Sequence, residues 1–228
     1  MSVEDQKKAA AEEAVKYIKA GMKVGLGTGS TANYFIDALA ARKLDVICVS
    51  TSTATHKRAK QQGLKMSSIE DNPFLDVTVD GTDEFDAELR LIKGGGGAMH
   101  REKIVASSSR FMIVIADHSK QVKTLGKFLL PVEVSRFGVN ATAWKMERVF
   151  EHMNLPRKMS IRVRDGKPFI TEAGNAIIDC ALEAIAEPET LDAMLNNIPG
   201  LVETGLFIGI CGVVYMGTDN GVVEITRK

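Results

Sequence analysis

The chain has 228 residues, with 29 lysine and arginine residues against 29 aspartate and glutamate residues. That length is enough for one domain, or for a large domain with a smaller companion. A formal net charge of +0 gives no global field that would attract nucleic acid or an anionic membrane. We therefore expect neither nucleic acid nor membrane as a partner, and any anion-binding patch has to be local.

Cysteine and histidine positions argue against a disulfide framework and against a metal site. Cys48, Cys180 and Cys211 lie far apart in apolar surroundings, as buried thiols of a reducing compartment do. The four histidines show no metal-ligand spacing. The N-terminal segment is charged, and no stretch approaches the ~18 apolar residues of a membrane span. We expect a cytoplasmic protein.

The first half of the chain alternates helical and strand patterns. We predict helices at 7–20 and 33–42, a helix that ends at Gly63, and strands at 23–26, 45–50, 75–79 and 110–116. Strands that alternate with helices indicate a parallel sheet with helices on both faces.

The pattern changes at about residue 127 to that of a small α+β insert. There we predict helices at 141–154 and 189–197, and strands at 131–134, 159–163, 168–171 and 176–180. The strands 159–163 and 168–171 are predicted to form a hairpin across Asp165 and Gly166. The last predicted strands, at 201–207, 213–216 and 222–225, are expected to return to the first sheet.

The sequence GTGSTA joins the first strand to the following helix. This arrangement aims backbone N–H groups and a helix dipole at a phosphate. A dinucleotide fingerprint does not fit, because Ser30 replaces its third glycine and Asp45 precedes the next strand instead of ending it. A site for one small phosphate and plain helix capping by Ser30 and Thr31 explain the motif equally well. The hydroxyl-rich segment 50–55 likewise either lines a sugar site or caps a helix.

Residues 77–103 hold the densest group of chemically active residues. A strand ends in Asp80, Gly81 and Asp83, and Lys93 then precedes four consecutive glycines. Glycines lose more backbone entropy on folding than other residues, so such a run usually serves close approach to a ligand, most often an anion. The alternative is a loop of turn chemistry. Because the carboxyl ends of parallel strands share one edge, segments 27–31, 80–83 and 117–120 are expected to meet there.

The motifs GTGSTA, DGTDE, KGGGGAMHREK, DHSK and PGLVETGLF resemble the type A family of ribose-5-phosphate isomerases over nearly the whole chain. The resemblance implies interconversion of ribose 5-phosphate and ribulose 5-phosphate without a metal or organic cofactor. It also implies a Rossmann-like α/β domain, at 1–126 with 200–228, and a ferredoxin-like α+β domain at 127–199. A homodimer, or else a tetramer, is the implied assembly.

Site residues follow from the same resemblance. Contacts near the substrate phosphate or chain are assigned to Thr28, Gly29, Ser30 and Thr31, and Lys120 is expected to reach the substrate from the DHSK turn. Contacts with the sugar hydroxyls are assigned to Asp80, Gly81, Thr82 and Asp83. Contacts with the reacting oxygens are assigned to Lys93, Gly94, Gly95 and Gly96. Glu102 is the implied proton acceptor.

The residue types fit the chemistry of an enediolate intermediate. A carboxylate such as Glu102 is a suitable carbon base when it is partly desolvated, because burial raises a carboxylate pKa. Lys93 and the glycine N–H groups would stabilise the developing oxyanion. Asp80 or Asp83 would shuttle hydroxyl protons and open the sugar ring, and the sequence leaves open which acid does which.

Two places depart from the family pattern, and two related kinds of protein give the alternative functions. The family pattern TDNGN is TEAGN here, at 171–175, and Thr82 stands where alanine is common. A sugar-phosphate sensor domain would keep the phosphate loop but needs a DNA-binding domain, for which this chain has no room. A related acyl-CoA transferase would use its glutamate as a nucleophile and needs a larger chain.

Overall fold

The structure is a computed structural model that describes residues 1–227. The chain forms two units. Unit 1 comprises Met1–Thr82, Arg101–Gln121 and the chain from Gly209 onward. Unit 2 comprises Asp83–His100 and Val122–Ile208.

Unit 1 is built on a seven-stranded sheet in the order β16-β15-β7-β4-β1-β2-β3. Its strands are β1 (Lys23–Leu26), β2 (Ile47–Ser50), β3 (Lys65–Ser67), β4 (Val77–Asp80), β7 (Met112–Asp117), β15 (Cys211–Thr218) and β16 (Gly221–Thr226). Neighbouring strands run parallel except for the terminal β15–β16 hairpin. The mostly parallel sheet predicted from the sequence is confirmed. The strand β3 was missed because it is short and none of its residues is fully buried.

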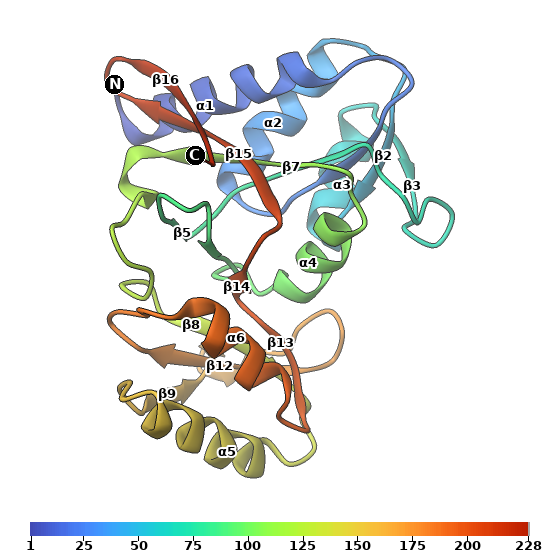
Figure 1. Ribbon diagram of the computed structural model, residues 1–228. Helices are drawn as coiled ribbons and strands as arrows, with labels where there is room; N and C mark the ends of the chain where they lie inside the picture. Colours follow the sequence, from blue (N-terminus) through green and yellow to red (C-terminus); the bar gives the residue numbers. More distant parts are fainter. Residues whose placement is uncertain (228) are drawn as a thin grey trace. The chain divides into compact units, whose positions relative to one another are not determined.

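Helices cover both faces of this sheet, as predicted (Figure 1). They are α1 (Val3–Ala14), α2 (Ser30–Ala41), α3 (Thr53–Gln61) and α4 (Met99–Ser107), with 3-10 turns η1 (Val15–Tyr17) and η2 (His118–Lys120). One core joins α1, α2 and α3 to the apolar side chains of the central strands. On the other face, Val105 of α4 packs with Val49 and Leu75. The helix α1 begins at Val3 because Ser2 and Asp5 form a capping box.

Unit 2 contains a four-stranded antiparallel sheet in the order β13-β8-β12-β9. Its elements are β8 (Leu130–Val134), α5 (Val139–His152), β9 (Lys158–Ile161), β12 (Ala176–Ala181), α6 (Pro188–Asn196) and β13 (Leu201–Thr204). Alternate residues of β8 and β12 share one core with the buried faces of α5 and α6. This βαββαβ order is the ferredoxin-like arrangement implied by the resemblance.

Short strands complete unit 2. They are β5 (Glu84–Phe85), β6 (Leu91–Ile92) and β14 (Leu206–Phe207) in one sheet, and β10 (Val163–Arg164) with β11 (Lys167–Pro168) in a hairpin. The hairpin turns at Asp165 and Gly166, with φ values of 53° and 73°, as its predicted turn requires. In this hairpin only two residues of β10 pair with two residues of β11. The preceding residues form β9, which pairs with β12 instead.

The prediction that residues 201–207 form one strand of the first sheet is wrong. Gly205 divides them into β13, which pairs with β8, and β14, which pairs with β6. The Gly205 N–H donates to the Pro131 carbonyl at 2.7 Å, and a side chain at 205 would meet the Lys93 carbonyl at 2.5 Å. The strands β15 and β16 do join the first sheet, as predicted.

Residues 83–100 group with unit 2, whereas the predicted boundaries placed them with the α/β domain. The Glu84 carboxylate explains part of this grouping, because it accepts hydrogen bonds from the N–H groups of Gly126 and Phe128 at 2.8 and 2.5 Å. The division of the chain into domains at 126 and 200 stays a prediction.

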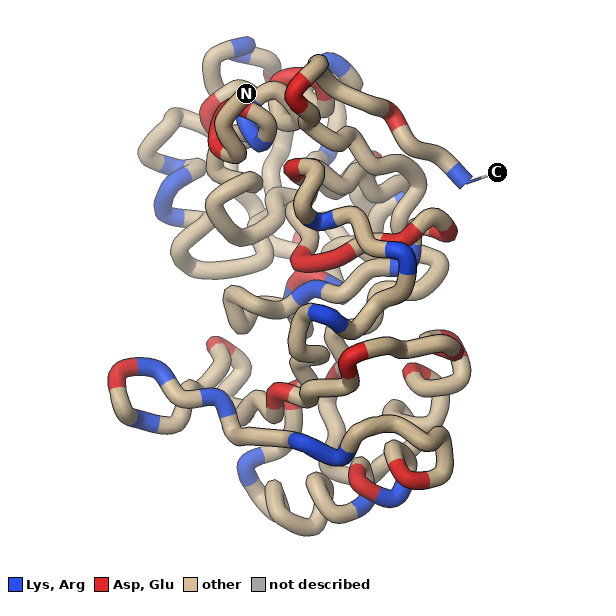
Figure 2. The backbone as a smooth tube through the Cα atoms, turned by 90° about the vertical axis from the view of Figure 1, so that its left-hand side faces the viewer, with Lys and Arg blue, Asp and Glu red and all other residues tan. Residues whose placement is uncertain are grey.

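Basic and acidic residues are both scattered along the backbone (Figure 2). Within the described residues no helix is long and apolar enough to cross a bilayer. All three cysteines are free and buried. Burial raises the pKa of the Cys48 thiol to about 12, so this thiol is protonated at neutral pH.

Candidate active site

The loop between β1 and α2 leaves a helix N-terminus without a side-chain cap. Gly29 is the N-cap residue, with φ 126°, and Ser30 is already the first helical residue. No side chain among residues 1–227 caps the helix. The capping alternative for Ser30 and Thr31 is therefore wrong, and the first-turn N–H groups are available to an anion.

Asp80 ties the end of β4 to this loop. Its side chain is fully buried, and its Oδ1 accepts hydrogen bonds from the N–H groups of Thr28 and Gly81, at 3.1 and 2.7 Å. Gly27 provides the necessary space, because a Cβ there would lie 2.0 Å from the Asp80 Cγ. A Cβ added at Gly81 would lie 3.7 Å from the Thr31 Cβ, which is an ordinary contact distance. Unit 1 thus brings the predicted residues of both strand ends together.

Within segment 50–55, the hydroxyls of Thr51, Ser52 and Thr55 are engaged within the fold. Thr28 Oγ1 lies 2.7 Å from Thr51 Oγ1, 2.9 Å from Ser52 Oγ and 3.1 Å from Thr55 Oγ1. The last three residues are buried, and Ser52 caps α3 by accepting from the Thr55 N–H. The capping explanation is confirmed, and the cluster also fixes the Thr28 side chain.

The DHSK turn forms η2 at the end of β7. Asp117 caps it by accepting from the Ser119 N–H at 3.0 Å. The His118 Nδ1 lies 2.7 Å from Oε1 of Gln6, a buried residue of α1. This anchor was not predicted, because the glutamine and the turn are 112 residues apart in the sequence. Lys120 ends the turn and is half-buried.

Lys93 is held in unit 2 by its backbone and its surroundings. It follows β6 and is only 3% exposed. Its N–H donates to the Gly205 carbonyl at 2.9 Å, and its Nζ lies 5.5 Å from the centroid of the Phe207 ring. A lysine that serves only as a surface charge is rarely buried. A buried lysine is typical of a functional amine.

The glycine run has a defined conformation. Gly94 adopts φ 110°, and a Cβ there would lie 2.7 Å from Met99 Sδ. The Gly95 N–H donates to Asp83 Oδ2 at 2.8 Å, and the Gly97 N–H to the Gly94 carbonyl at 3.0 Å. Within residues 1–227 the N–H groups of Gly94 and Gly96 have no acceptor. Of the predicted amides, these two are therefore free to hold a ligand oxygen.

Arg162 clamps this run from behind and was not predicted. Its Nη1 donates to the carbonyls of Gly94 and Gly95 at 2.8 and 3.2 Å. Its Nε and Nη2 donate to the two carboxylate oxygens of Asp179, at 2.9 and 2.5 Å. The bidentate pair fixes the guanidinium plane, and the guanidinium in turn orients the two glycine peptides.

Glu102 lies in the first turn of α4 and is 4% exposed. Its neighbour Arg101 is exposed, so the helix turns the two side chains to different surroundings, as expected for adjacent positions. Glu102 therefore has the desolvation that the proposed base requires.

The chain passes between the units within two of the predicted motifs. One crossing lies between Thr82 and Asp83, and the other between His100 and Arg101. Within the described part of the chain, no group of three His, Cys, Asp or Glu side chains could hold a metal ion. The absence of a metal requirement stays a prediction.

Together these features define an α/β protein with an uncapped helix N-terminus for an anion, buried acids and a buried lysine beside free amides. The sequence profile of ribose 5-phosphate isomerase A (phosphoriboisomerase A) matches residues 47–221. A ribose-5-phosphate isomerase A of Parvibaculum lavamentivorans is 52% identical over 225 residues, which is 97% of each chain. The chain belongs to the ribose 5-phosphate isomerase A family.

Solved structures agree over the whole length. Ribose 5-phosphate isomerase from Plasmodium falciparum superimposes with a TM-score of 0.93 at 34% identity and covers 99% of both chains. A D-ribose-5-phosphate isomerase in complex with phospho-erythronic acid gives a TM-score of 0.92 at 37% identity and covers 100% of both chains.

Proposed function

We propose that this protein interconverts D-ribose 5-phosphate and D-ribulose 5-phosphate through an enediolate, a step of the non-oxidative pentose phosphate pathway. The observation that carries the proposal is the Lys93–Glu102 segment, which keeps a buried lysine, two free amides and a buried glutamate in a chain of this family. The sensor alternative is not favoured, because the matched relatives are named as isomerases.

In the proposed reaction, Glu102 removes the C2 proton of the open-chain aldose. The electron pair moves into the C1–C2 bond, and negative charge develops on O1, where Lys93 and the Gly94 and Gly96 amides stabilise it. A proton then moves from O2 to O1, and Glu102 returns its proton to C1. Asp80 and Asp83 are the candidates for the hydroxyl proton transfer and for ring opening.

The phosphate is assigned to the N-terminus of α2, and Lys120 is the candidate for a further contact with the substrate. The uncapped N–H groups at Gly29, Ser30 and Thr31 support this assignment. Phospho-erythronic acid, bound in a structural relative, is a phosphorylated sugar acid and so has the chemistry of this substrate class. A cytoplasmic location and a homodimer or tetramer are part of the proposal, and sedimentation velocity would measure the assembly.

The decisive experiment incubates the protein with ribose 5-phosphate in deuterated water. We expect ribulose 5-phosphate to form, with deuterium at the exchanging carbon whenever the Glu102 proton equilibrates with solvent before transfer. A parallel sample with EDTA should react at the same rate. Saturable sugar-phosphate binding without turnover would favour the sensor instead, and loss of activity with EDTA would contradict the metal-free mechanism.

A further inference from the structure

A pocket lies in unit 1, and none of the residues that line it is assigned to the active site. Its volume is about 450 Å³, within the range of small-molecule sites. It opens beside the carboxyl ends of β2 and β3, where Ser50 and Ser67 are the last strand residues, and against α4. The carboxyl ends of parallel strands are where α/β sheets bind ligands.

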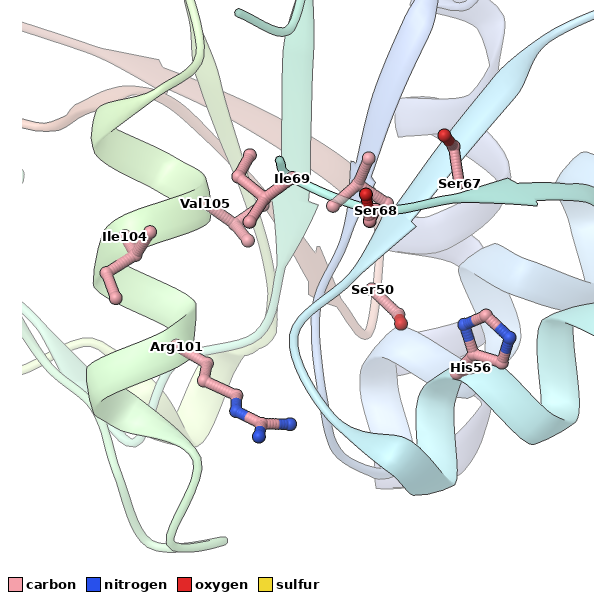
Figure 3. Close-up of a pocket in the computed structure, with 9 residues that line it drawn as sticks. Ser50, His56, Ser67, Ser68, Ile69, Arg101, Ile104 and Val105 are labelled. Atoms are coloured by element: carbon pink, nitrogen blue, oxygen red, sulfur yellow. The ribbon is translucent and has the colours of Figure 1, made fainter. Parts of the chain in front are cut away.

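One side of the pocket carries groups that bind anions. Arg101 extends from α4 toward the side where Ser50 and His56 lie (Figure 3). Within residues 1–227 the side chains of Ser50 and His56 form no hydrogen bond. A guanidinium, a hydroxyl and an imidazole around one space suit a phosphate or carboxylate.

The remaining wall is aliphatic and comes from Val49, Ile69, Ile104 and Val105. Ile69 and Val105 lie near each other in the view of Figure 3. An occupant with only a charged group would leave this wall in contact with water. The composition therefore favours a ligand with an apolar body.

The two other hydroxyls of the pocket are already engaged. Ser67 Oγ accepts from Asn72 Nδ2 at 2.8 Å, and Ser68 Oγ donates to Asp71 Oδ2 at 2.6 Å. The Asp71 carboxylate would repel an anion at Ser68. The charged group of a ligand is therefore expected at the Arg101 end.

We propose that this pocket is a second ligand site, which binds a small anion with an apolar body. The phosphate or carboxylate contacts Arg101, His56 and Ser50, and the body packs on Val49, Ile69 and Val105. None of these residues belongs to the proposed catalytic set, so the inference does not depend on the isomerase activity.

Phenyl phosphate is a suitable probe, and the ring resonances of His56 report its binding by NMR. We expect a saturable shift of His56 in the full chain, and about tenfold weaker binding of inorganic phosphate, which lacks the apolar body. Arg101→Gln should weaken phenyl phosphate binding about tenfold or more, because the charged contact is lost. Arg110→Gln removes another exposed arginine, outside the pocket, and should leave the affinity unchanged.

Ile69→Asp provides a second test, because it places a negative charge inside the pocket and should abolish the His56 shift. Backbone amide spectra would establish that each variant is folded. An unmoved His56 in the wild type, or equal affinity in wild type and Arg101→Gln, would overturn the proposal. Ribose 5-phosphate turnover of the same samples separates this result from the fate of the isomerase assignment.

Discussion

Asp80 and Asp83 each use one carboxylate oxygen to hold a loop. Asp80 Oδ1 accepts from Thr28 and Gly81, and Asp83 Oδ2 accepts from Gly95. Which acid serves O2 and which opens the ring is a question for single substitutions.

Glu102→Gln keeps the side-chain shape and removes the base. We expect kcat to fall by about 10²–10⁴-fold, the usual contribution of a general base. The Kd for ribose 5-phosphate, measured by calorimetry, should change little because the phosphate contacts remain. Glu12→Gln, on the exposed face of α1, is the matched control. Near-normal turnover of Glu102→Gln would remove this residue from the mechanism.

Arg162→Met tests the clamp on the glycine run. Losing the donors to the Gly94 and Gly95 carbonyls should let both peptides reorient, and we expect kcat to fall by about 10- to 100-fold with a smaller change in KM. Arg162→Lys should not restore activity, because an ammonium cannot reproduce the planar fork.

Asp179→Asn is the control for stability. It weakens the ion pair but leaves Arg162 able to donate to the two carbonyls, so its loss of unfolding free energy should resemble that of Arg162→Met while its kcat stays higher. Equal losses of kcat in the two variants, at equal stability in urea unfolding, would mean that Arg162 is merely structural.

At the scale of elements, the TEAGN turn keeps two side chains of the family pattern in contact with a buried carboxyl group. Thr171 Oγ1 and Asn175 Nδ2 both donate to Oε1 of Glu133 at 2.9 Å, and Glu133 is 1% exposed. The two residues that differ from TDNGN, Glu172 and Ala173, are exposed. The threonine and asparagine that bind the buried carboxylate are kept.

Thr171→Val should therefore destabilise the protein by about 1–3 kcal/mol, because it removes a donor to a buried charge without changing the side-chain shape. The double variant Glu172→Asp with Ala173→Asn should shift the unfolding free energy by less than about 0.5 kcal/mol. Urea unfolding measures both. A larger effect from the exposed pair than from Thr171→Val would refute this account of the turn.

At the scale of the whole fold, carboxylates around the N-terminus make the free energy of unfolding depend on pH. Hydrogen bonds lower the pKa of Asp5 below 3.8, chiefly from Ser2, and that of Glu4 below 4.5, chiefly from Lys7. The N-terminal amine, 3.1 Å away, lowers the pKa of Asp219 below 3.8. Their stabilisation is fully present above these ordinary values and is lost as pH falls through the lowered ones.

The urea midpoint should accordingly fall between about pH 5 and pH 3. Asp219→Asn should lose stability at neutral pH and show a shallower acid dependence than the wild type. Chemical denaturation at a series of pH values measures the slope. Parallel slopes for the two proteins would show that Asp219 does not contribute.

The sequence by itself predicted many of the elements and the candidate site residues. Short contiguous patterns specified the strand β1, the turn at Asp165 and Gly166, and the start of α6 at Pro188, because periodicity and turn preferences act locally. The motifs also marked Asp80, Lys93 and Glu102, whose burial was then found in the structure.

Only the tertiary structure decided how these residues are held. Arg162 reaches Gly94 across 68 residues, His118 reaches Gln6 across 112, and Gly205 splits a run that reads as one strand. No local pattern encodes such partners, because each depends on where the chain returns after folding. Local sequence sets conformation and chemistry, whereas the partners of a buried polar group are set by packing.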